Sequence, residues 1–259
     1  MKILVLIKQV PDKDSPLTIA EDNLSLAENN ITWVSNESDN YALEEALQLK
    51  EKHGGEVVAC TLGNESARQV LKDAMAKGAD RGIFLSDSQF DSLDILSLAK
   101  VFASAFKDES FDLILSGLQS DDHGNSQLGL LLAELLNMSH ASLAMGTEVI
   151  DDNTIKVKRE LEGGWFQWTQ LTLPASISIQ SGINTPRYAT LKGIMMVKNK
   201  TTDQLSAQDI GALNQTPLVK QENLYVPEKS KETVFIDGTP DEIAGKLVDV
   251  FKNEIKVLS

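Results

Sequence analysis

Residues 113–129 read LILSGLQSDDHGNSQLG, and this stretch joins a short apolar run to a polar loop and the start of a helix. The run 113–115 shows no alternation of polar and apolar residues, which favours a strand buried on both faces. The loop 117–129 is rich in glycine and polar side chains, and a helical pattern extends over 124–136. A strand followed by a loop and a helix is the repeating unit of a parallel sheet.

The same order occurs three times earlier in the chain. The sequence predicts strands at 3–7, 57–62 and 82–85, and helices at 41–53, 66–77 and 93–106. Either Asp39 or Asn40 is expected to cap the first of these helices. Repeated alternation of strands and helices indicates an α/β fold with a doubly wound, mostly parallel, Rossmann-like sheet.

After Asn137 the pattern changes to β-rich segments. Strands are predicted at 144–150, 154–160, 166–173 and 175–180, with Asp151-Asp152-Asn153 as a hairpin turn. These strands would extend the same sheet or pack beside it. We assign 1–183 to an α/β domain, 184–200 to an exposed loop, and 201–259 to an extended C-terminal arm whose last helix covers 240–257.

The overall composition limits the possible partners. The chain has 259 residues, of which 42% are hydrophobic and 24% charged, and a formal net charge of −14. The size suits one large α/β domain with appendages, and the negative charge argues against nucleic acid as a partner. Neither a signal-peptide pattern nor an apolar stretch long enough to span a membrane is found. We therefore expect a cytoplasmic protein without membrane insertion.

The residue types that catalyse reactions or bind metals are scattered along the chain. His53, His123 and His140 lack the spacing of metal ligands. Cys60 falls inside a predicted strand, as a buried apolar residue would, and the sequence has no nucleophile elbow. We predict no catalytic residue and no metal site.

The loop 117–129 is the best candidate for a ligand site. It is expected at the carboxyl end of its strand, where parallel sheets bind ligands and where a helix N-terminus favours an anionic group. Hydrogen-bonding side chains are available at Gln119, Ser120, Asn125, Ser126 and Gln127. The loop lacks the P-loop lysine and the three-glycine spacing, so a simple helix cap is the alternative. Asp121 and Asp122 also oppose a phosphate, unless one turns away or holds a ribose hydroxyl.

A second candidate is NTPRYATLKGIMMVK, residues 184–198. Pro186 restricts its own φ and disfavours helix at Thr185, so the chain leaves the domain in an extended or turning path. An exposed apolar surface is then expected at Leu191, Ile194, Met195 and Met196. The alternative is an ordinary loop whose apolar side chains fold back onto the core.

The order of residues in 184–198 closely resembles the recognition loop of the electron transfer flavoprotein β subunit family. In the family's nucleotide loop, Gly117, Gln119, Asp122 and Gly129 also match in place. Further family signatures occur at Lys8-Gln9, at Asn36, at Leu43-Glu44-Glu45-Ala46, at 77–82 and at 159–164. The resemblance covers residues 1–200 and weakens in the arm.

The resemblance implies an adenine nucleotide α-hydrolase-like fold and an electron carrier without bond-making catalysis of its own. The family forms a heterodimer in which the α subunit holds most of one FAD, and the β subunit binds an adenine nucleotide, usually AMP. The arm 201–259 would then embrace the α subunit. The carried-over nucleotide positions are Leu6, Asn36, Glu37, Ser38, Asp39, Leu62, Gly117, Gln119, Ser120, Asp122, Asn125, Ser126, Gln127 and Leu128.

The resemblance also implies protein partners. Acyl-CoA or amine dehydrogenases would donate electrons, and a quinone oxidoreductase would pass them toward the respiratory chain. Leu191 would anchor a dehydrogenase, with Tyr188, Ile194 and Met195 in the same surface. Glu160 stands at the position of a family glutamate that pairs with an arginine of the α subunit's FAD domain.

Several positions depart from the family pattern. Leu128 replaces a threonine or valine, Asp121 adds a carboxylate, and His123 and Asn125 replace smaller or acidic residues. A further charge within about 5 Å of a phosphate costs on the order of a few kcal/mol, so an empty nucleotide site is an alternative. Lys13 stands near a position at which some members place an aromatic against the flavin.

Two other functions stay open on the sequence. A bifurcating member would carry a second FAD in place of AMP and oxidise NADH, and 8–12 resembles that branch. In contrast, 117–120 and 159–164 resemble the branch that serves a bacterial trimethylamine-type dehydrogenase. A stand-alone regulatory module that binds an adenine nucleotide would account for 1–136, but not for the recognition loop.

Overall fold

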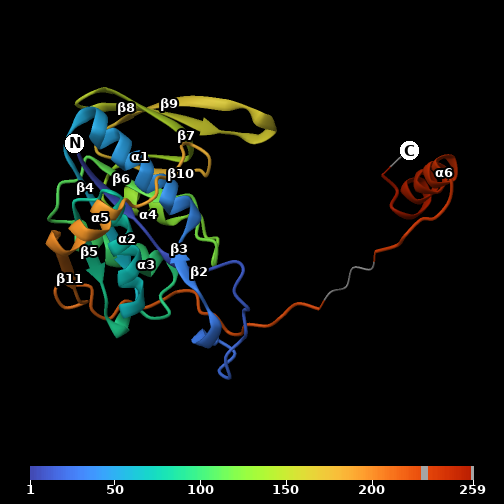
Figure 1. The fold of residues 1–259 in the computed structure, drawn as a ribbon, viewed down its shortest axis with the longest axis horizontal. Coiled ribbons are helices and arrows are strands. Elements are labelled where there is room, and N and C mark those ends of the chain that lie inside the picture. The colour runs from blue at the N-terminus through green and yellow to red at the C-terminus, as the bar shows by residue number, and fades with distance from the viewer. Residues whose placement is uncertain (229–232, 258–259) are drawn as a thin grey trace. The chain divides into compact units, whose positions relative to one another are not determined.

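The computed structural model describes residues 1–228 and 233–257 and consists of two compact units, Met1–Asn223 and Leu224–Ser259. The first unit is built on one nine-stranded sheet with the order β11-β5-β4-β1-β6-β10-β7-β8-β9 (Figure 1). The strands are β1 (Lys2–Leu6), β4 (Glu56–Leu62), β5 (Arg81–Leu85), β6 (Leu113–Gly117), β7 (Ser139–Asp151), β8 (Thr154–Glu160), β9 (Phe166–Thr172), β10 (Ala175–Ile179) and β11 (Thr202–Leu205).

Neighbouring strands from β11 to β7 are parallel, whereas β7, β8 and β9 form an antiparallel extension. A separate antiparallel pair is formed by β2 (Gln9–Pro11) and β3 (Trp33–Ser35). The helices are α1 (Glu37–His53), α2 (Arg68–Lys77), α3 (Ile95–Phe106), α4 (Leu128–Leu135) and α5 (Leu191–Met196). The predicted α/β fold with a doubly wound sheet is therefore confirmed.

Two hydrophobic clusters fill the two faces of the sheet, because successive residues of each strand point to opposite sides. Ile3 and Val5 pack in the cluster that includes α1 and α2. Leu4 and Leu6 pack in the other cluster, which includes Phe102 of α3 and Leu132 of α4. The strands lack polar alternation because both of these faces are covered.

Two predicted helix starts are wrong. Asp39 is not a cap: α1 begins at Glu37 after the N-cap residue Asn36, and Asp39 lies buried within the first turn. The fourth helix begins at Leu128 and not at residue 124. Gly124 and Ser126 have φ values of 60° and 55°, a conformation that an α-helix cannot contain.

The first unit extends beyond the predicted start of the arm at residue 201. Strand β11 pairs in parallel with β5 at the edge of the main sheet. Ala207, Ile210 and Ala212 then lie buried in the cluster on the α3 face. A division at Asn223 therefore describes the packing of the chain better than one at residue 200.

The second unit contains α6 (Pro240–Asp249), followed by a π-helical turn over Val250–Glu254. Regular structure ends before the predicted residue 257, since Lys256 has a φ of 58°. Residues 229–232, 258 and 259 of the predicted arm lie outside the described residues. Within the part of the chain that the structure describes, none of the helices combines the length and apolar character needed to cross a bilayer.

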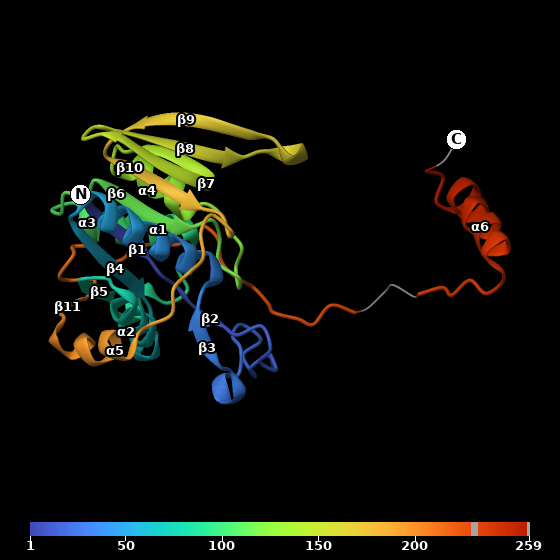
Figure 2. The same cartoon turned by 45° about the horizontal axis from the view of Figure 1, so that its top comes forward.

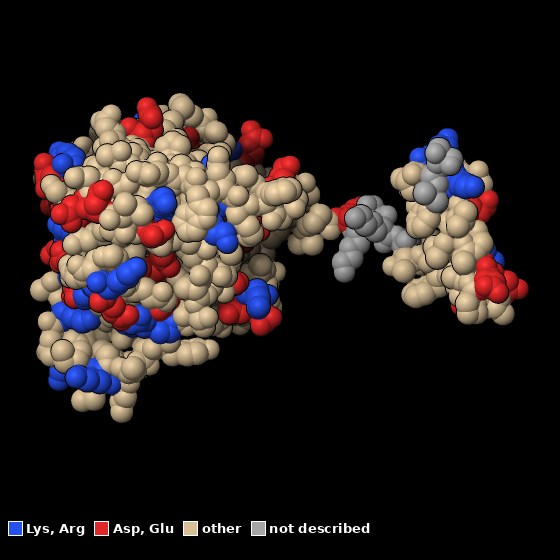
Figure 3. All heavy atoms as spheres, turned by 90° about the horizontal axis from the view of Figure 1, so that it is seen from above, with Lys and Arg blue, Asp and Glu red and all other residues tan. Residues whose placement is uncertain are grey.

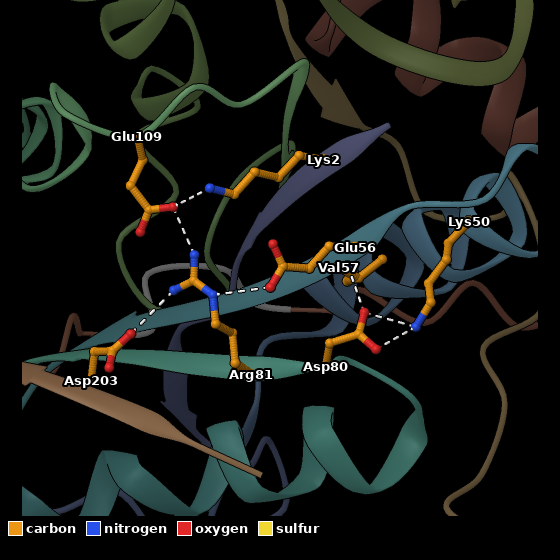
Figure 4. Close-up of polar contacts among 8 residues, drawn as sticks. All are labelled: Lys2, Lys50, Glu56, Val57, Asp80, Arg81, Glu109 and Asp203. Carbon is orange, nitrogen blue, oxygen red and sulfur yellow. Dashed lines mark hydrogen bonds and ion pairs between the residues drawn. The ribbon is translucent and has the colours of Figure 1, made fainter.

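The amino-terminal edge of the sheet is joined by an ion-pair network centred on Arg81 (Figure 4). Its guanidinium contacts Glu56 at 3.1 Å, Glu109 at 2.7 Å and Asp203 at 3.2 Å. Glu109 also pairs with Lys2. These residues lie on or beside β1, β4, β5, β6 and β11, so one side chain links the starts of several strands. The Arg81 side chain is only 17% exposed, which reduces screening by solvent.

We predict that Arg81→Met lowers the free energy of unfolding by about 1 to 3 kcal/mol, because three carboxylates lose a charged hydrogen-bond donor. Urea denaturation measures the change, and Lys107→Met provides a control at an exposed lysine. Equal effects of the two substitutions would contradict a structural role for the network.

Candidate functional site

A cavity opens at the carboxyl ends of β1 and β6, the neighbouring strands in the middle of the sheet. After β1 the chain passes to α1 on one face, and after β6 it passes to α4 on the other (Figure 2). Such a switch in direction leaves a crevice between the strand ends, which is where open α/β sheets bind ligands. The observed cavity therefore lies where the sequence predicted a ligand.

Most of the predicted nucleotide positions line this cavity. They are Leu6, Asn36, Asp39, Leu62, Gly117, Gln119, Ser120, Asn125, Ser126, Gln127 and Leu128. Glu37, Ser38 and Asp122 are not among the lining residues. The loop 117–128 and the start of α1 are thus brought together from distant parts of the chain.

Asp39 connects the two strand ends beside the cavity. Its Oδ2 accepts a hydrogen bond from the Lys8 N–H, and its Oδ1 accepts one from the Gly117 N–H, both at 2.8 Å. Burial raises the pKa of Asp39 to about 7, although both backbone donors favour the ionised form. A side chain at position 117 would place Cβ 2.2 Å from Ser38 Oγ, so only glycine allows this approach.

Asn36 and Ser38 attach the loop after β6 to the start of α1. Asn36 Nδ2 and Ser38 Oγ both donate to the Gln119 carbonyl oxygen, at 2.9 and 2.7 Å. Asn36 Oδ1 in turn accepts the Asp121 N–H at 2.9 Å. These contacts fix the loop, and they explain how Ser38 can shape the cavity without lining it.

The two loop carboxylates are directed to partners within the protein. Asp121 Oδ2 accepts the Glu37 N–H at 3.2 Å, at the positive end of α1. Asp122 forms an ion pair with Lys8 Nζ at 2.6 Å. Burial opposes ionisation of Asp122, yet the hydrogen bonds from Lys8 and Ser120 lower its pKa. The negative charges of Asp121 and Asp122, which the sequence analysis expected to oppose a phosphate, are therefore compensated by groups of the protein itself.

Much of the cavity lining is apolar, and the sequence analysis missed most of that part. Lining residues that were not predicted are Ile7, Lys8, Leu93, Ile95, Leu98, Phe102, Ser116, Leu118 and His123. The helical period of 93–106 identified an apolar face. It did not indicate which residues of that face reach the carboxyl edge of the sheet.

Two features leave hydrogen-bonding capacity free within the cavity. Ser116 Oγ is buried and, among the described residues, has no hydrogen-bond partner. Helix α4 begins beside it with Gln127 as N-cap residue, and no side chain caps its first N–H groups. Burial also lowers the pKa of His123, which favours its neutral form at pH 7. A ligand with an apolar ring and a polar or anionic end would match both the apolar lining and the free hydrogen-bonding groups.

The segment 184–198 forms a separate surface. Tyr188 and Leu191 are 93% and 76% exposed, and Ile194 and Met195 are also exposed. The alternative in which this leucine folds back onto the core is therefore wrong. Glu160 lies at the end of β8, half-buried, and accepts a hydrogen bond from Gln180 at 3.1 Å.

Charged groups on the first unit are mixed. Lys and Arg side chains alternate with Asp and Glu over the face seen in Figure 3. Near α5, however, a separate pocket is lined by Arg68, Lys72, Lys198 and Lys200. This local concentration of cations contrasts with the net charge of −14 for the whole chain.

The sequence of the chain is similar to those of known proteins along most of its length. Residues 23–210 match the model of the electron transfer flavoprotein domain. The chain is 34% identical to the electron transfer flavoprotein subunit beta of Methylophilus methylotrophus, with 99% of each chain covered. It is 33% identical to that of Bacillus subtilis over the full length of both chains. The mouse protein is 31% identical, with 96% of this chain and 98% of the mouse chain covered.

We predict that titration of Asp39 gives the protein a pH-dependent stability. The carboxyl pKa is about 7 in the folded chain and 3.8 by reference, so the folded state keeps a proton that the unfolded state releases. The resulting stabilisation is present at low pH and is lost as pH rises toward 7.

The test compares wild type with Asp39→Asn, which cannot titrate, by urea denaturation without nucleotide between about pH 5 and pH 8. The difference in the free energy of unfolding, wild type minus variant, should fall as pH rises. A difference that does not change with pH would mean that the Lys8 and Gly117 donors keep the carboxylate ionised throughout.

Proposed function

The chain belongs to the electron transfer flavoprotein family, among relatives of the β subunit, and we propose that it is the β subunit of a heterodimeric electron carrier. It would accept electrons from a flavoprotein dehydrogenase and pass them toward the respiratory chain in the cytoplasm of a bacterium. The similarity to β subunits along the whole chain carries this proposal.

FAD, held mainly by an α subunit, would supply the redox chemistry. The present chain would contribute position and electrostatics. Glu160 would face a cation of the α subunit's flavin domain and bias its orientation by about 1 kcal/mol or less, as expected for an ion pair at a rim. The exposed apolar side chains of the second unit would bury against the α subunit: Leu247, Val248, Phe251 and Ile255.

We propose that the cavity binds an adenine nucleotide, with AMP as the preferred ligand. The apolar side chains of Leu6, Leu62 and Leu128 would contact the adenosine. The phosphate would lie at the N-terminus of α4, where Asn125 and Ser126 would add hydrogen bonds. The role would be structural, because a ligand that binds only the folded state stabilises it by mass action.

Nucleotide analysis of the heterodimer tests both parts of the proposal. The chain is purified with its α subunit and denatured, and the released nucleotides are identified by mass spectrometry. One FAD and one AMP per heterodimer are expected. Two FAD would indicate the bifurcating type, FAD alone would exclude a resident adenylate, and no α subunit with no flavin would indicate a stand-alone nucleotide-binding module.

A pair of serine variants tests the location of the nucleotide. Ser116→Ala removes the unpartnered hydroxyl in the cavity and should weaken AMP binding about fivefold, the equivalent of one hydrogen bond. Ser176→Ala is the control, since its hydroxyl donates to the Gly129 carbonyl oxygen and does not line the cavity. FAD content should be the same in both variants.

The exposed face of α5 would bind the dehydrogenase, with Leu191 as anchor. Burial of one leucine contributes about 1.5 to 3 kcal/mol, so Leu191→Ala should weaken the transient complex about tenfold or more. Steady-state transfer from the dehydrogenase measures this change as a higher KM for the carrier. Heterodimer formation, FAD content and reduction by dithionite should not change.

Leu218→Ala is a matched control, because Leu218 is 78% exposed and lies outside α5. If Leu191→Ala left transfer intact and lowered Tm by many degrees, Leu191 would serve folding and not docking.

A further inference from the structure

Residues 187–200, which we call the docking segment, are attached to the body of the protein on both sides of α5. On the amino-terminal side, Arg187 Nε contacts Glu44 Oε2 at 2.8 Å, and Nη1 contacts Glu51 at 2.5 Å. The Glu44 side chain is only 6% exposed. Burial would raise the pKa of Glu44, but hydrogen bonds from Arg187 and Gln48 lower it, so the pair stays charged.

Lys200 attaches the carboxyl-terminal side. Its Nζ donates to the Met75 carbonyl oxygen at 2.9 Å and to the Ala79 carbonyl oxygen at 2.6 Å. Both acceptors lie at or just after the end of α2, where the helix dipole favours a cation. The two anchors therefore fix the chain on either side of α5: Arg187 attaches it to α1, and Lys200 attaches it to the end of α2.

Gly193 lies where α5 comes close to the backbone of α2, and the two helices lie side by side in Figures 1 and 2. A Cβ at this position would be 2.1 Å from the Ala76 carbonyl oxygen, a backbone atom that cannot rotate away. The Gly193 N–H is bonded to Thr190 Oγ1 at 3.0 Å, which caps the helix. No residue other than glycine fits this arrangement.

The exposed side chains gain their orientation from this packing. Leu191, Ile194 and Met195 belong to the same short helix as Gly193, and their side chains are exposed. This orientation requires that α5 stays packed on α2. A helix of this length is not stable by itself in water. Its conformation must therefore come from the Thr190 cap, the two anchors and the contact at Gly193.

We propose that Gly193 is a positioning residue for partner docking: it lets α5 lie on the end of α2, and Arg187 and Lys200 then hold the apolar face in a preformed orientation. This inference rests on the proposed function, in which that face binds a dehydrogenase. A surface ordered before encounter avoids the entropic cost of ordering a loop on binding. The orientation of the docking surface thus depends on contacts with α1 and α2 as well as on the docking segment.

Gly193→Ala is a sharp test because helix propensity and packing predict opposite results. Alanine is a better helix former than glycine, so an isolated α5 would become more ordered. The clash with the Ala76 carbonyl oxygen predicts instead that α5 leaves α2. Hydrogen exchange of the amides 191–197 in the purified heterodimer distinguishes these results. We expect exchange to be about tenfold faster in the variant.

Docking is measured with the same preparations, with a purified acyl-CoA dehydrogenase and its acyl-CoA substrate as the probe donor. Gly193→Ala should raise the KM for the carrier about fivefold to tenfold and leave kcat unchanged, since the flavin is not touched. Lys200→Met, which removes the second anchor, should change exchange and KM in the same direction. Asn199→Ala, at an exposed position of the same segment, is the control.

The outcomes separate this inference from the proposed function. If Leu191→Ala raises KM but Gly193→Ala changes neither exchange nor KM, the positioning role is wrong and docking through α5 stands. Slower exchange in Gly193→Ala would also overturn it. If Leu191→Ala does not affect transfer while Gly193→Ala speeds exchange, α5 is held on α2 but is not the docking surface. Docking through α5 and the positioning role of Gly193 are then both wrong, whereas the role of the chain as a carrier subunit is not affected.

Discussion

The buried carboxylate of Asp39 is the interaction on which the site depends, because it holds the ends of β1 and β6 by the N–H groups of Lys8 and Gly117. Parallel strands leave such groups free where their chains turn to opposite faces of the sheet. One side chain from α1 satisfies both groups, and the cavity opens beside it. The geometry of the ligand site is therefore set by a buried polar contact between the two strand ends.

The two edges of the sheet are stabilised in different ways. At the amino-terminal edge, Arg81 and its carboxylate partners close the strand starts with charged contacts. At the carboxyl edge, the Lys8–Asp122 pair ties the loop to β1, while Ser116 and the first N–H groups of α4 keep hydrogen-bonding capacity available. This asymmetry leaves one edge able to bind a ligand and makes the other a rigid support.

The sequence predicted the central strands and main helices because their signal is local: apolar runs and helical periodicity depend on the residues themselves. Strand β11 was missed because its residues, Thr202–Leu205, are largely polar and form a strand only by pairing with β5. The start of α4 was misplaced because the left-handed backbone conformation of Ser126 cannot be recognised from the spacing of apolar residues. Asp39 was taken for a cap, since only the fold brings Gly117 within its reach.

Helix α1 serves two surfaces at once: Asp39 in its first turn borders the cavity, whereas Glu44 and Glu51 hold Arg187 at the base of the docking segment. Successive helical residues are rotated by about 100°, so one residue inserted between Asp39 and Glu44 would turn the later carboxylates away from the arginine. A change in the length of α1 between these residues would therefore disturb both surfaces at once, whereas a substitution at another position of the helix would not. Insertions and deletions among family members should therefore avoid this helix.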